Sequence, residues 1–355
     1  MTPFFQLDPK IESASAAALQ QVAPRFTEID EVTEYNQLKV LRAFMDNGIS
    51  ERHFGSSTGY GYGDEGRETL DKVWAQVFGA EDALVRHNFT CGTHTLAVAL
   101  FGVLRPGDKM LCVSGMPYDT LHSVIGLTGE NMGSLKDYGI AFDCVPLKEE
   151  HLDYEAIAKA VDDTVTMVYI QRSRGYELRA SLSLEETQKV AEIAKEKNPN
   201  CIVMVDNCYC EFVNKQEPTQ VGADLIAGSL IKNAGGGMAR TGGYIAGRAD
   251  LVELCAYRLN APGLGKELGC TLETPRDMYL GFYYAPGVVC EAIKTAIYAQ
   301  CLLELVGKKP IPRYCEDHND IVTCFDADTA DAHQNAQRDA DNADRQRLKQ
   351  HHSSK

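Results

Sequence analysis

Apolar and polar positions follow two different patterns along this chain, and together they predict an α/β fold. From about residue 82 onward, short apolar runs, some rich in β-branched residues, are typical of buried strands. These runs lie at Ala83–Arg86, Lys109–Val113, Ile140–Val145, Val165–Ile170, Cys201–Asp206, Leu225–Ser229 and Gly243–Ala246. Apolar residues at helical spacing lie between or after them, at Gly92–Leu104, Leu184–Lys197 and Ala249–Leu259. The alternation predicts a mostly parallel sheet of six or seven strands flanked by helices.

Four further regions lie outside this alternation. Residues 10–47 have apolar side chains at helical spacing, and another long helical pattern covers Arg276–Leu305. Before the first strand, the stretch HFGSSTGYGYGDEGRETL is rich in glycine and tyrosine and opens into an amphipathic helix. From Lys308 onward the residues are dominated by Asp, Asn, Gln, Arg and His, so we expect residues 308–355 to be disordered.

Composition narrows the class of protein. The net charge of −15 argues against nucleic acid or an anionic membrane as the main partner. The N-terminus lacks a basic region followed by a long apolar run, and no stretch reaches roughly 18 apolar residues, so we expect neither a signal peptide nor a spanning helix. The 12 cysteines lack the spacing of a disulfide framework. Buried thiols in a reduced, cytoplasmic protein are the better interpretation.

Two residues at the ends of predicted strands carry the candidate chemistry. Asp206 directly follows an apolar run, which places a carboxylate at the ligand-binding edge of a parallel sheet. A helix cap or a turn aspartate is the alternative for this residue alone. Lys232 follows a second apolar run in DLIAGSLIKNAGGG, within a glycine-rich turn that a cofactor can approach closely. A Schiff-base lysine needs partial desolvation, which lowers its pKa, whereas a lysine in a surface turn is the alternative.

The spacing joins these two residues into one candidate site. They lie 26 positions apart, which is enough for one strand end, a connection and the next strand. The pair is typical of a pyridoxal 5′-phosphate (PLP) site, where an aspartate keeps the pyridine nitrogen protonated. The turn around Thr90, Gly92, Thr93 and His94 opens an apolar helix, and its N–H groups form a candidate phosphate site. Ordinary capping by Thr90 or Thr93 explains the same turn.

Other motifs give weaker signals. PGLGKEL departs from the phosphate-binding loop pattern, which favours a structural role or a local contact for Lys266. The pair Cys208 and Cys210 has no second pair at zinc spacing and the histidines are scattered, so we predict no metal site. Residues 172–174 follow a strand on the ligand side. Contact with the cofactor or a substrate carboxylate and a solvated turn are both open for them.

These residues together resemble the fold-type-I PLP enzymes of the cystathionine/methionine lyase superfamily, and more closely its bacterial aluminium-resistance, methionine γ-lyase-like branch. The resemblance spans about residues 25–305 and rests on GYGYGDEGRETLDKVWAQVFGAEDALVRHNFTCGTHT, IQRSRGYELRASL, VDNCYCEF and GSLIKNAGGG. It implies a PLP cofactor and a dimer or tetramer with shared active sites. It also implies a carbon–sulfur lyase that acts on a sulfur amino acid by β- or γ-elimination.

Position by position, the resemblance assigns roles to four residues around the cofactor. Lys232 matches the Schiff-base lysine and Asp206 the partner of the pyridine nitrogen. Ser229, three residues before the lysine, matches a phosphate-binding serine. Tyr118 in SGMPYDTLHSVIG matches a tyrosine that stacks on the ring and assists proton transfer. The superfamily often has threonine just before the lysine, but this chain has Ile231, so one phosphate contact is missing.

The resemblance also assigns the remaining phosphate contacts. Cys91 and Gly92 fall on the phosphate turn, with Thr93 beside them as a further candidate. Tyr62, in the glycine- and tyrosine-rich stretch, resembles a residue that reaches the phosphate of the neighbouring subunit, with Tyr60 as its rival.

The polar tail departs from the superfamily, whose smaller C-terminal domain supplies the arginine for the substrate carboxylate. We therefore expect that domain to be absent or truncated. The predicted organisation is an N-terminal helical arm (1–55), a PLP-binding domain (56–260), a connecting segment with the long helix (261–307) and the tail (308–355). Besides the lyase, two hypotheses stay open. One is another fold-type-I PLP enzyme, such as an aldolase or an aminotransferase, and the other is a non-catalytic remnant that acts through oligomer contacts.

Overall fold

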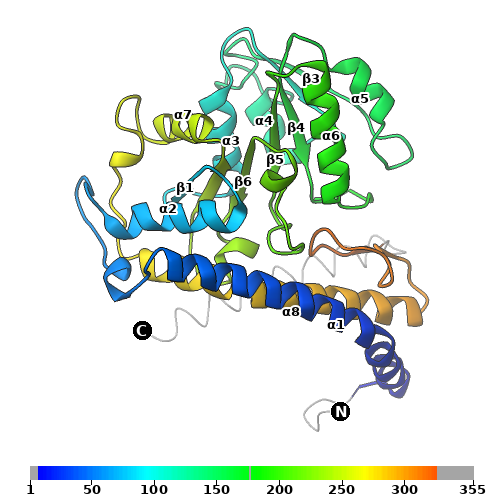
Figure 1. Cartoon of the computed structure of the whole chain (residues 1–355). Coiled ribbons are helices and arrows are strands. Elements are labelled where there is room, and N and C mark those ends of the chain that lie inside the picture. The colour runs from blue at the N-terminus through cyan, green and yellow to red at the C-terminus, as the bar shows by residue number, and fades with distance from the viewer. Residues whose placement is uncertain (1–6, 176, 326–355) are drawn as a thin grey trace.

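The computed structural model describes residues 7–175 and 177–325, and a seven-stranded sheet lies at its centre (Figure 1). The strands are β1 (Asp82–Arg86), β2 (Lys109–Cys112), β3 (Ala141–Cys144), β4 (Val165–Gln171), β5 (Ile202–Asp206), β6 (Leu225–Ser229) and β7 (Gly243–Gly247). The α-helices are α1 (Pro9–Asp46), α2 (Glu65–Phe78), α3 (Gly92–Val103), α4 (Asp119–Ile125), α5 (Tyr154–Ala160), α6 (Leu184–Lys197), α7 (Ala249–Leu259) and α8 (Pro275–Leu305). Short 3₁₀ helices lie at Glu51–Phe54, Pro218–Val221, Asn233–Gly235 and Gly265–Glu267.

The strand order explains why residues far apart in the sequence meet at one edge. The order is β1-β7-β6-β5-β4-β2-β3, and all strands run parallel except β7, which is antiparallel to both neighbours. In the middle of the sheet, Asp206 at the end of β5 is in register with Gln171 on β4 and Ala227 on β6. The carboxyl ends of these three strands therefore form the edge where ligands bind in open α/β sheets.

The predicted elements agree closely with the observed ones. Every predicted strand is present with bounds that differ by at most one residue. Only β7 is antiparallel to its neighbours, so the sheet is mostly parallel, as predicted. The two helices that the apolar pattern did not predict, α4 and α5, have only seven residues each. Such short helices contain too few turns to give a clear helical periodicity.

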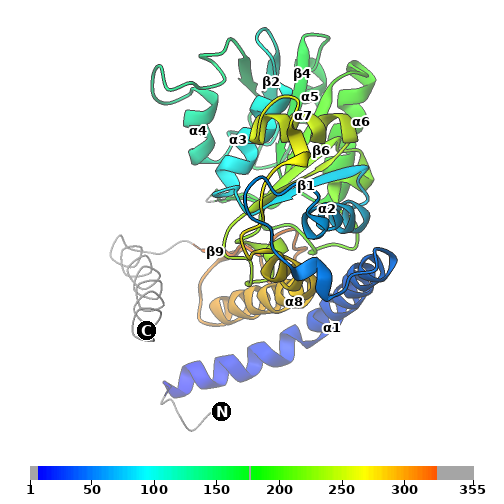
Figure 2. The same ribbon diagram turned by 90° about the vertical axis from the view of Figure 1, so that its left-hand side faces the viewer.

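Both faces of the sheet are buried under helices. Neighbouring residues along a strand point to opposite sides, so Val168 packs in the core beneath α2, α6 and α8 while Tyr169 packs in the core beneath α3, α4 and α7. The two longest helices, α1 and α8, lie side by side below the sheet in both views (Figures 1 and 2). Within the described residues, no helix is both long and apolar enough to cross a membrane.

An aromatic cluster joins α8 to the sheet. The Trp74 indole on α2 stacks on the Phe282 ring on α8, with ring centroids 3.6 Å apart and planes inclined by 17°. Tyr244 on β7 and Phe78 on α2 pack against the same indole at centroid distances of 5.5 and 5.9 Å. Trp74 is fully buried. The cluster therefore holds the long helix against the sheet from one side.

The prediction that the chain is disordered from Lys308 onward is wrong for residues 308–325, which we call the C-terminal segment. Two short strands pair there antiparallel, β8 (Pro310–Ile311) and β9 (Cys324–Phe325). The Asp320 side chain is buried and accepts hydrogen bonds from the Ser173 hydroxyl at 3.0 Å and the Arg174 N–H at 3.1 Å. Paired polar groups can be buried, so a polar composition did not prevent packing here. The rest of the predicted tail lies outside the described residues.

Replacing Trp74 by alanine should lower the free energy of unfolding by about 3–5 kcal/mol, because a fully buried indole leaves a large cavity. Urea denaturation followed by circular dichroism measures this change. Leu38→Ala on α1 is the control, because that side chain is 57% exposed and its loss should change stability by no more than about 0.5 kcal/mol. Equal losses in the two variants would contradict the role of the cluster.

Candidate functional site

A cavity of about 590 Å³ opens at the carboxyl edge of the sheet, where the strand order predicts a ligand. Residues from the ends of β4, β5 and β6, the start of α3, the start of α4 and the C-terminal segment line it. Six of the residues that the sequence analysis singled out are among them: Cys91, Gly92, Thr93, Tyr118, Asp206 and Lys232. These six residues are up to 141 positions apart in the chain.

Asp206 and Lys232 meet inside this cavity, as their spacing predicted. The Asp206 carboxylate accepts a hydrogen bond from the Cys208 N–H at 3.0 Å. Burial raises the pKa of Asp206, and the nearby Lys232 ammonium opposes this shift only in part. For Lys232, burial alone would lower the pKa, but the acidic groups of Cys208, Asp206, Tyr209 and Glu211 outweigh it and raise the pKa. The predicted lowering of the lysine pKa is therefore wrong, because the amine lies among acidic neighbours.

Gly92 lines the cavity, and Ser229 lies next to it. A Cβ added at Gly92 would lie 3.4 Å from Cβ of Ser229, 3.5 Å from Sγ of Cys208 and 3.7 Å from Nζ of Lys232. Glycine thus leaves open the space between the turn and the lysine. The Ser229 hydroxyl is fully buried and has no hydrogen-bond partner within the described part of the chain. Because buried hydroxyls are normally paired, this one is suited to a bound acceptor such as a phosphate oxygen.

The turn before α3 is capped differently from the alternative that the sequence left open. Cys91 is the N-cap residue, and its sulfur accepts the His94 N–H at 3.4 Å. The Thr90 N–H instead donates to Nδ1 of His94 at 3.1 Å, and the Thr93 hydroxyl is 2.7 Å from the hydroxyl of Thr120. Neither threonine caps the helix, so the remaining N–H groups of its first turn stay available for an anion.

Tyr118 lies across the cavity and is held by a residue that the sequence analysis did not single out. Its N–H donates to Oε1 of Gln171 at 2.6 Å, and Nε2 of Gln171 donates to the Ser173 carbonyl at 3.1 Å. Gln171 ends β4 and lines the cavity. Its place at the end of a predicted strand, next to that of Asp206, is the signal that could have identified it.

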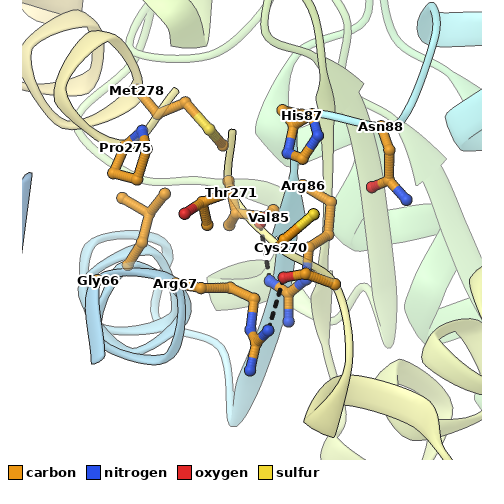
Figure 3. A pocket seen from close by; sticks show the side chains of 12 residues that line it. Gly66, Arg67, Val85, Arg86, His87, Asn88, Cys270, Thr271, Pro275 and Met278 are labelled. Carbon is orange, nitrogen blue, oxygen red and sulfur yellow. Dashed lines mark hydrogen bonds between the residues drawn. The ribbon is translucent and has the colours of Figure 1, made fainter. Parts of the chain in front are cut away.

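Tyr62 does not line this cavity. Its side chain is 63% exposed and its ring lies 5.8 Å from that of Tyr60, which is 75% exposed. The loop that carries both is fixed beside a small pocket of about 20 Å³, shown in Figure 3. Arg67 on α2 donates there to the carbonyls of Gly61 at 2.7 Å and Gly269 at 2.6 Å. The role of Tyr62 towards a neighbouring subunit stays a prediction.

Residues 172–174 have structural contacts rather than a solvated turn. The guanidinium of Arg172 is buried and donates to the side chains of Asn207 and Asn214, each at 2.9 Å. The Arg174 guanidinium is also buried and donates to the Ile311 carbonyl in the C-terminal segment. Only Ser173 of the three lines the cavity. Lys266 likewise has a local role, because its ammonium lies 2.6 Å from the Asp82 carboxylate.

Two parts of the cavity were missed entirely by the sequence analysis. Tyr209, which follows β5, lines it with a left-handed backbone (φ 70°). Residues 321–324 of the C-terminal segment, near the end of the described chain, also line it. The apolar pair Ile321-Val322 within the polar tail is a signal that could have identified this segment. No sequence pattern indicated the backbone conformation of Tyr209.

A buried carboxyl group lies behind the site. Glu211 is fully buried, and its side chain accepts a hydrogen bond from the Tyr244 hydroxyl at 2.9 Å. Burial raises the pKa of Glu211 to about 8, and the charge of Glu217 adds to this shift. The Asn233 side chain donates to the Glu211 carbonyl at 3.2 Å, which links this turn to the residue after Lys232.

Because the pKa of Glu211 rises from 4.5 to about 8 on folding, its protonated form stabilises the protein fully below pH 4.5, and this stability is lost as the pH rises through about 8. Glu211→Gln cannot ionise. The unfolding free energy of Glu211→Gln minus that of the native protein should therefore increase between pH 5 and 8, by up to about 1.4 kcal/mol per pH unit. Urea titrations across this range measure the slope. The exposed Glu196→Gln should show no such slope, and a flat difference for Glu211→Gln would refute the assignment.

Comparison with known proteins identifies the family. Residues 11–335 match the family model described as methionine gamma-lyase. The chain is 46% identical to the uncharacterized protein YnbB of Bacillus subtilis over 297 residues, which are 83% of this chain and 70% of that protein. L-methionine gamma-lyase of Pseudomonas putida is 24% identical over 72% of this chain and 58% of that enzyme.

A solved structure gives the same result. The crystal structure of a carbon-sulfur lyase involved in aluminum resistance from Clostridium novyi matches with a TM-score of 0.89 and 47% sequence identity. The match covers 92% of this chain and 78% of that one. The sequence match, the structural match and the α/β architecture agree with one another and with the resemblance seen in the sequence. The chain therefore belongs to the methionine gamma-lyase family of cystathionine/methionine lyase-like, PLP-dependent enzymes.

Proposed function

We propose that this chain binds PLP through Lys232 and acts as a carbon–sulfur lyase on a sulfur amino acid by β- or γ-elimination. The observation that carries the proposal is the grouping of three chemically distinct features around one cavity. These are the Lys232 amine and the buried Asp206 carboxyl, which line the cavity, and the unpartnered hydroxyl of Ser229, a residue that lies behind the lining residue Gly92. They match the aldehyde, the pyridine nitrogen and the phosphate of PLP, respectively.

The residues that are present fit this cofactor. The Ser229 hydroxyl and the N–H groups after Cys91 would hold the phosphate, because both supply donors that the described chain leaves unused. Gly92 supports the fit, since a side chain there would fill the space next to Lys232. Asp206 would keep the pyridine nitrogen protonated. When bound, PLP withdraws electrons from the substrate Cα and so makes loss of its proton possible.

The side chains of the cavity suit the remaining steps. Lys232 carries an amine that can accept the Cα proton once it is free, and Tyr118 lies on the same cavity as a second group able to move a proton. Leu96, Ile321 and Val322 add apolar walls, which favour a thioether side chain over a charged one and restrict water. The printed names of the relatives, a carbon-sulfur lyase and a methionine gamma-lyase, support the same class of reaction.

We also propose that a second copy of the chain completes the site. Tyr60 and Tyr62 are exposed on a loop that Arg67 fixes through the carbonyls of Gly61 and Gly269. Exposed aromatic rings on a rigid loop are typical of residues that contact another protein surface. This supports the role of Tyr62 in reaching the phosphate of a neighbouring subunit.

Lys232→Ala should abolish the visible absorbance of protein-linked PLP, because no other cavity residue within the described chain carries an amine. The absorbance spectrum of protein purified in the presence of PLP, and then dialysed, measures this. Lys266→Ala is the matched control, since that lysine pairs with Asp82 and does not line the cavity. Retention of the lysine-linked spectrum in Lys232→Ala, or its absence in the native protein, would rule out the assignment.

Asp206→Asn should lower the rate of thiol and 2-oxo acid release by about 100-fold or more while PLP stays bound, because the amide cannot keep the pyridine nitrogen protonated. Methionine, cystathionine and cysteine are the substrates to supply, with thiol and 2-oxo acid quantified separately. Thr93→Ser on the same cavity, which keeps the hydroxyl, is the control. Bound PLP without turnover of any amino acid would argue for a non-catalytic chain instead.

A further inference from the structure

We propose that Tyr209 is a positioning residue for Lys232. The Tyr209 ring holds the lysine amine in place when the amine is not linked to cofactor. The inference rests on the proposed function of Lys232. Both side chains line the same cavity, and Nζ of Lys232 lies 4.1 Å from the centroid of the Tyr209 ring. A cation at this distance from an aromatic face is attracted by the ring. The flexible lysine chain thus gains a fixed contact at its reactive end.

The backbone of this turn supports a functional role. Tyr209 has φ 70°, and Phe212 in the same turn has φ 63°. A left-handed conformation is unfavourable for such bulky side chains and persists only where the surroundings enforce it. Two such residues within four positions, directly after Asp206, indicate that the turn is held in shape against its own preference. Strained residues of this kind gather at functional sites.

A single buried carboxylate fixes the two ends of the turn. Oε2 of Glu217 accepts the Asn207 side-chain N–H at 2.9 Å, and Oε1 accepts the Phe212 N–H at 3.0 Å. Glu217 is fully buried, and Arg172 donates to the Asn207 oxygen at 2.9 Å from the other side. The segment between Asn207 and Phe212, which contains Tyr209, is therefore clamped at both ends.

A second contact fixes the turn relative to the lysine. The Asn233 side chain donates to the Glu211 carbonyl at 3.2 Å, so the residue after Lys232 is tied to the residue two positions after Tyr209. The backbone on either side of the ring–amine contact is thus joined by a hydrogen bond. Lys232 contacts the face of the Tyr209 ring. Removing the ring should therefore release the amine, whereas removing only the hydroxyl should not.

The first test uses cofactor-free protein with ¹³C-labelled lysine. The ring current of Tyr209 should shift the ε-methylene proton signal of Lys232 upfield, and its disappearance in Lys232→Ala assigns that signal. Tyr209→Phe keeps the ring and should retain the upfield shift, whereas Tyr209→Leu should lose it. An unchanged shift in Tyr209→Leu would overturn the inference, because the amine would then be held by other groups.

The second test separates positioning from binding in PLP-loaded protein. Tyr209→Leu should lower kcat roughly fivefold to tenfold with KM nearly unchanged, since the amine is misplaced but the substrate contacts remain. Tyr209→Phe should recover most of the loss. A Tyr209→Leu variant with native kcat, or a Tyr209→Phe variant as slow as Tyr209→Leu, would contradict a positioning role for the ring.

The two proposals can fail separately. If Lys232→Ala keeps the lysine-linked absorbance, the proposed function fails, whatever Tyr209 does. If the native absorbance is normal but both Tyr209 variants match the native protein in proton shift and kcat, only the role of Tyr209 fails. Tyr209→Met, an unbranched side chain without a ring, replaces Tyr209→Leu if that variant does not fold. If the protein turns over no amino acid, the proton shift alone decides whether Tyr209 positions Lys232.

Discussion

The juxtaposition of the Lys232 amine and the buried Asp206 carboxyl on one cavity is the constraint on which the rest of the site depends. Both groups lose solvation, and the charge of Lys232 opposes the rise that burial causes in the pKa of Asp206. Such pairs add little net stability, so their presence in a fold indicates a use other than stability. Here the pair lies on a cavity of about 590 Å³, and Ser229, with its unpartnered hydroxyl, lies behind the Gly92 wall of that cavity. Stability alone would not require this combination.

The sheet brings the pair together because of its strand order. Asp206 ends β5 and Lys232 follows β6, and these strands are adjacent and parallel. The C-terminal segment then closes the site, and α8 anchors this segment, since Oε1 of Gln300 on α8 accepts a hydrogen bond from Nε2 of the buried His318 ring at 2.8 Å. Asp320 continues this connection to the turn after β4. The cavity walls therefore depend on contacts between segments that are over 100 residues apart.

The sequence predicted the parts of this arrangement that repeat periodically along the chain. Apolar runs located every strand of the main sheet, and the end of a buried strand located Asp206 and Lys232. Gln171 occupied the same kind of position but lacked the charge that would have drawn notice. The left-handed φ of Tyr209 could not be predicted, because it is enforced by Glu217, ten residues away from Asn207, and not by local preference. The lysine pKa was mispredicted for the same reason, since its acidic neighbours are tertiary contacts.

The C-terminal segment shows how composition can mislead. Residues 308–325 begin a mostly polar stretch, and Asp320 and His318 are buried there because each of them finds a defined partner. A polar residue is excluded from a core only when its hydrogen bonds are left unmade. The partners, Ser173 and Gln300, come from the turn after β4 and from α8, so no window of local sequence reveals them. Polar tertiary contacts therefore hold the C-terminal segment as one wall of the cavity, whereas the wall with Asp206 and Lys232 is built from strand ends that the sequence pattern makes visible.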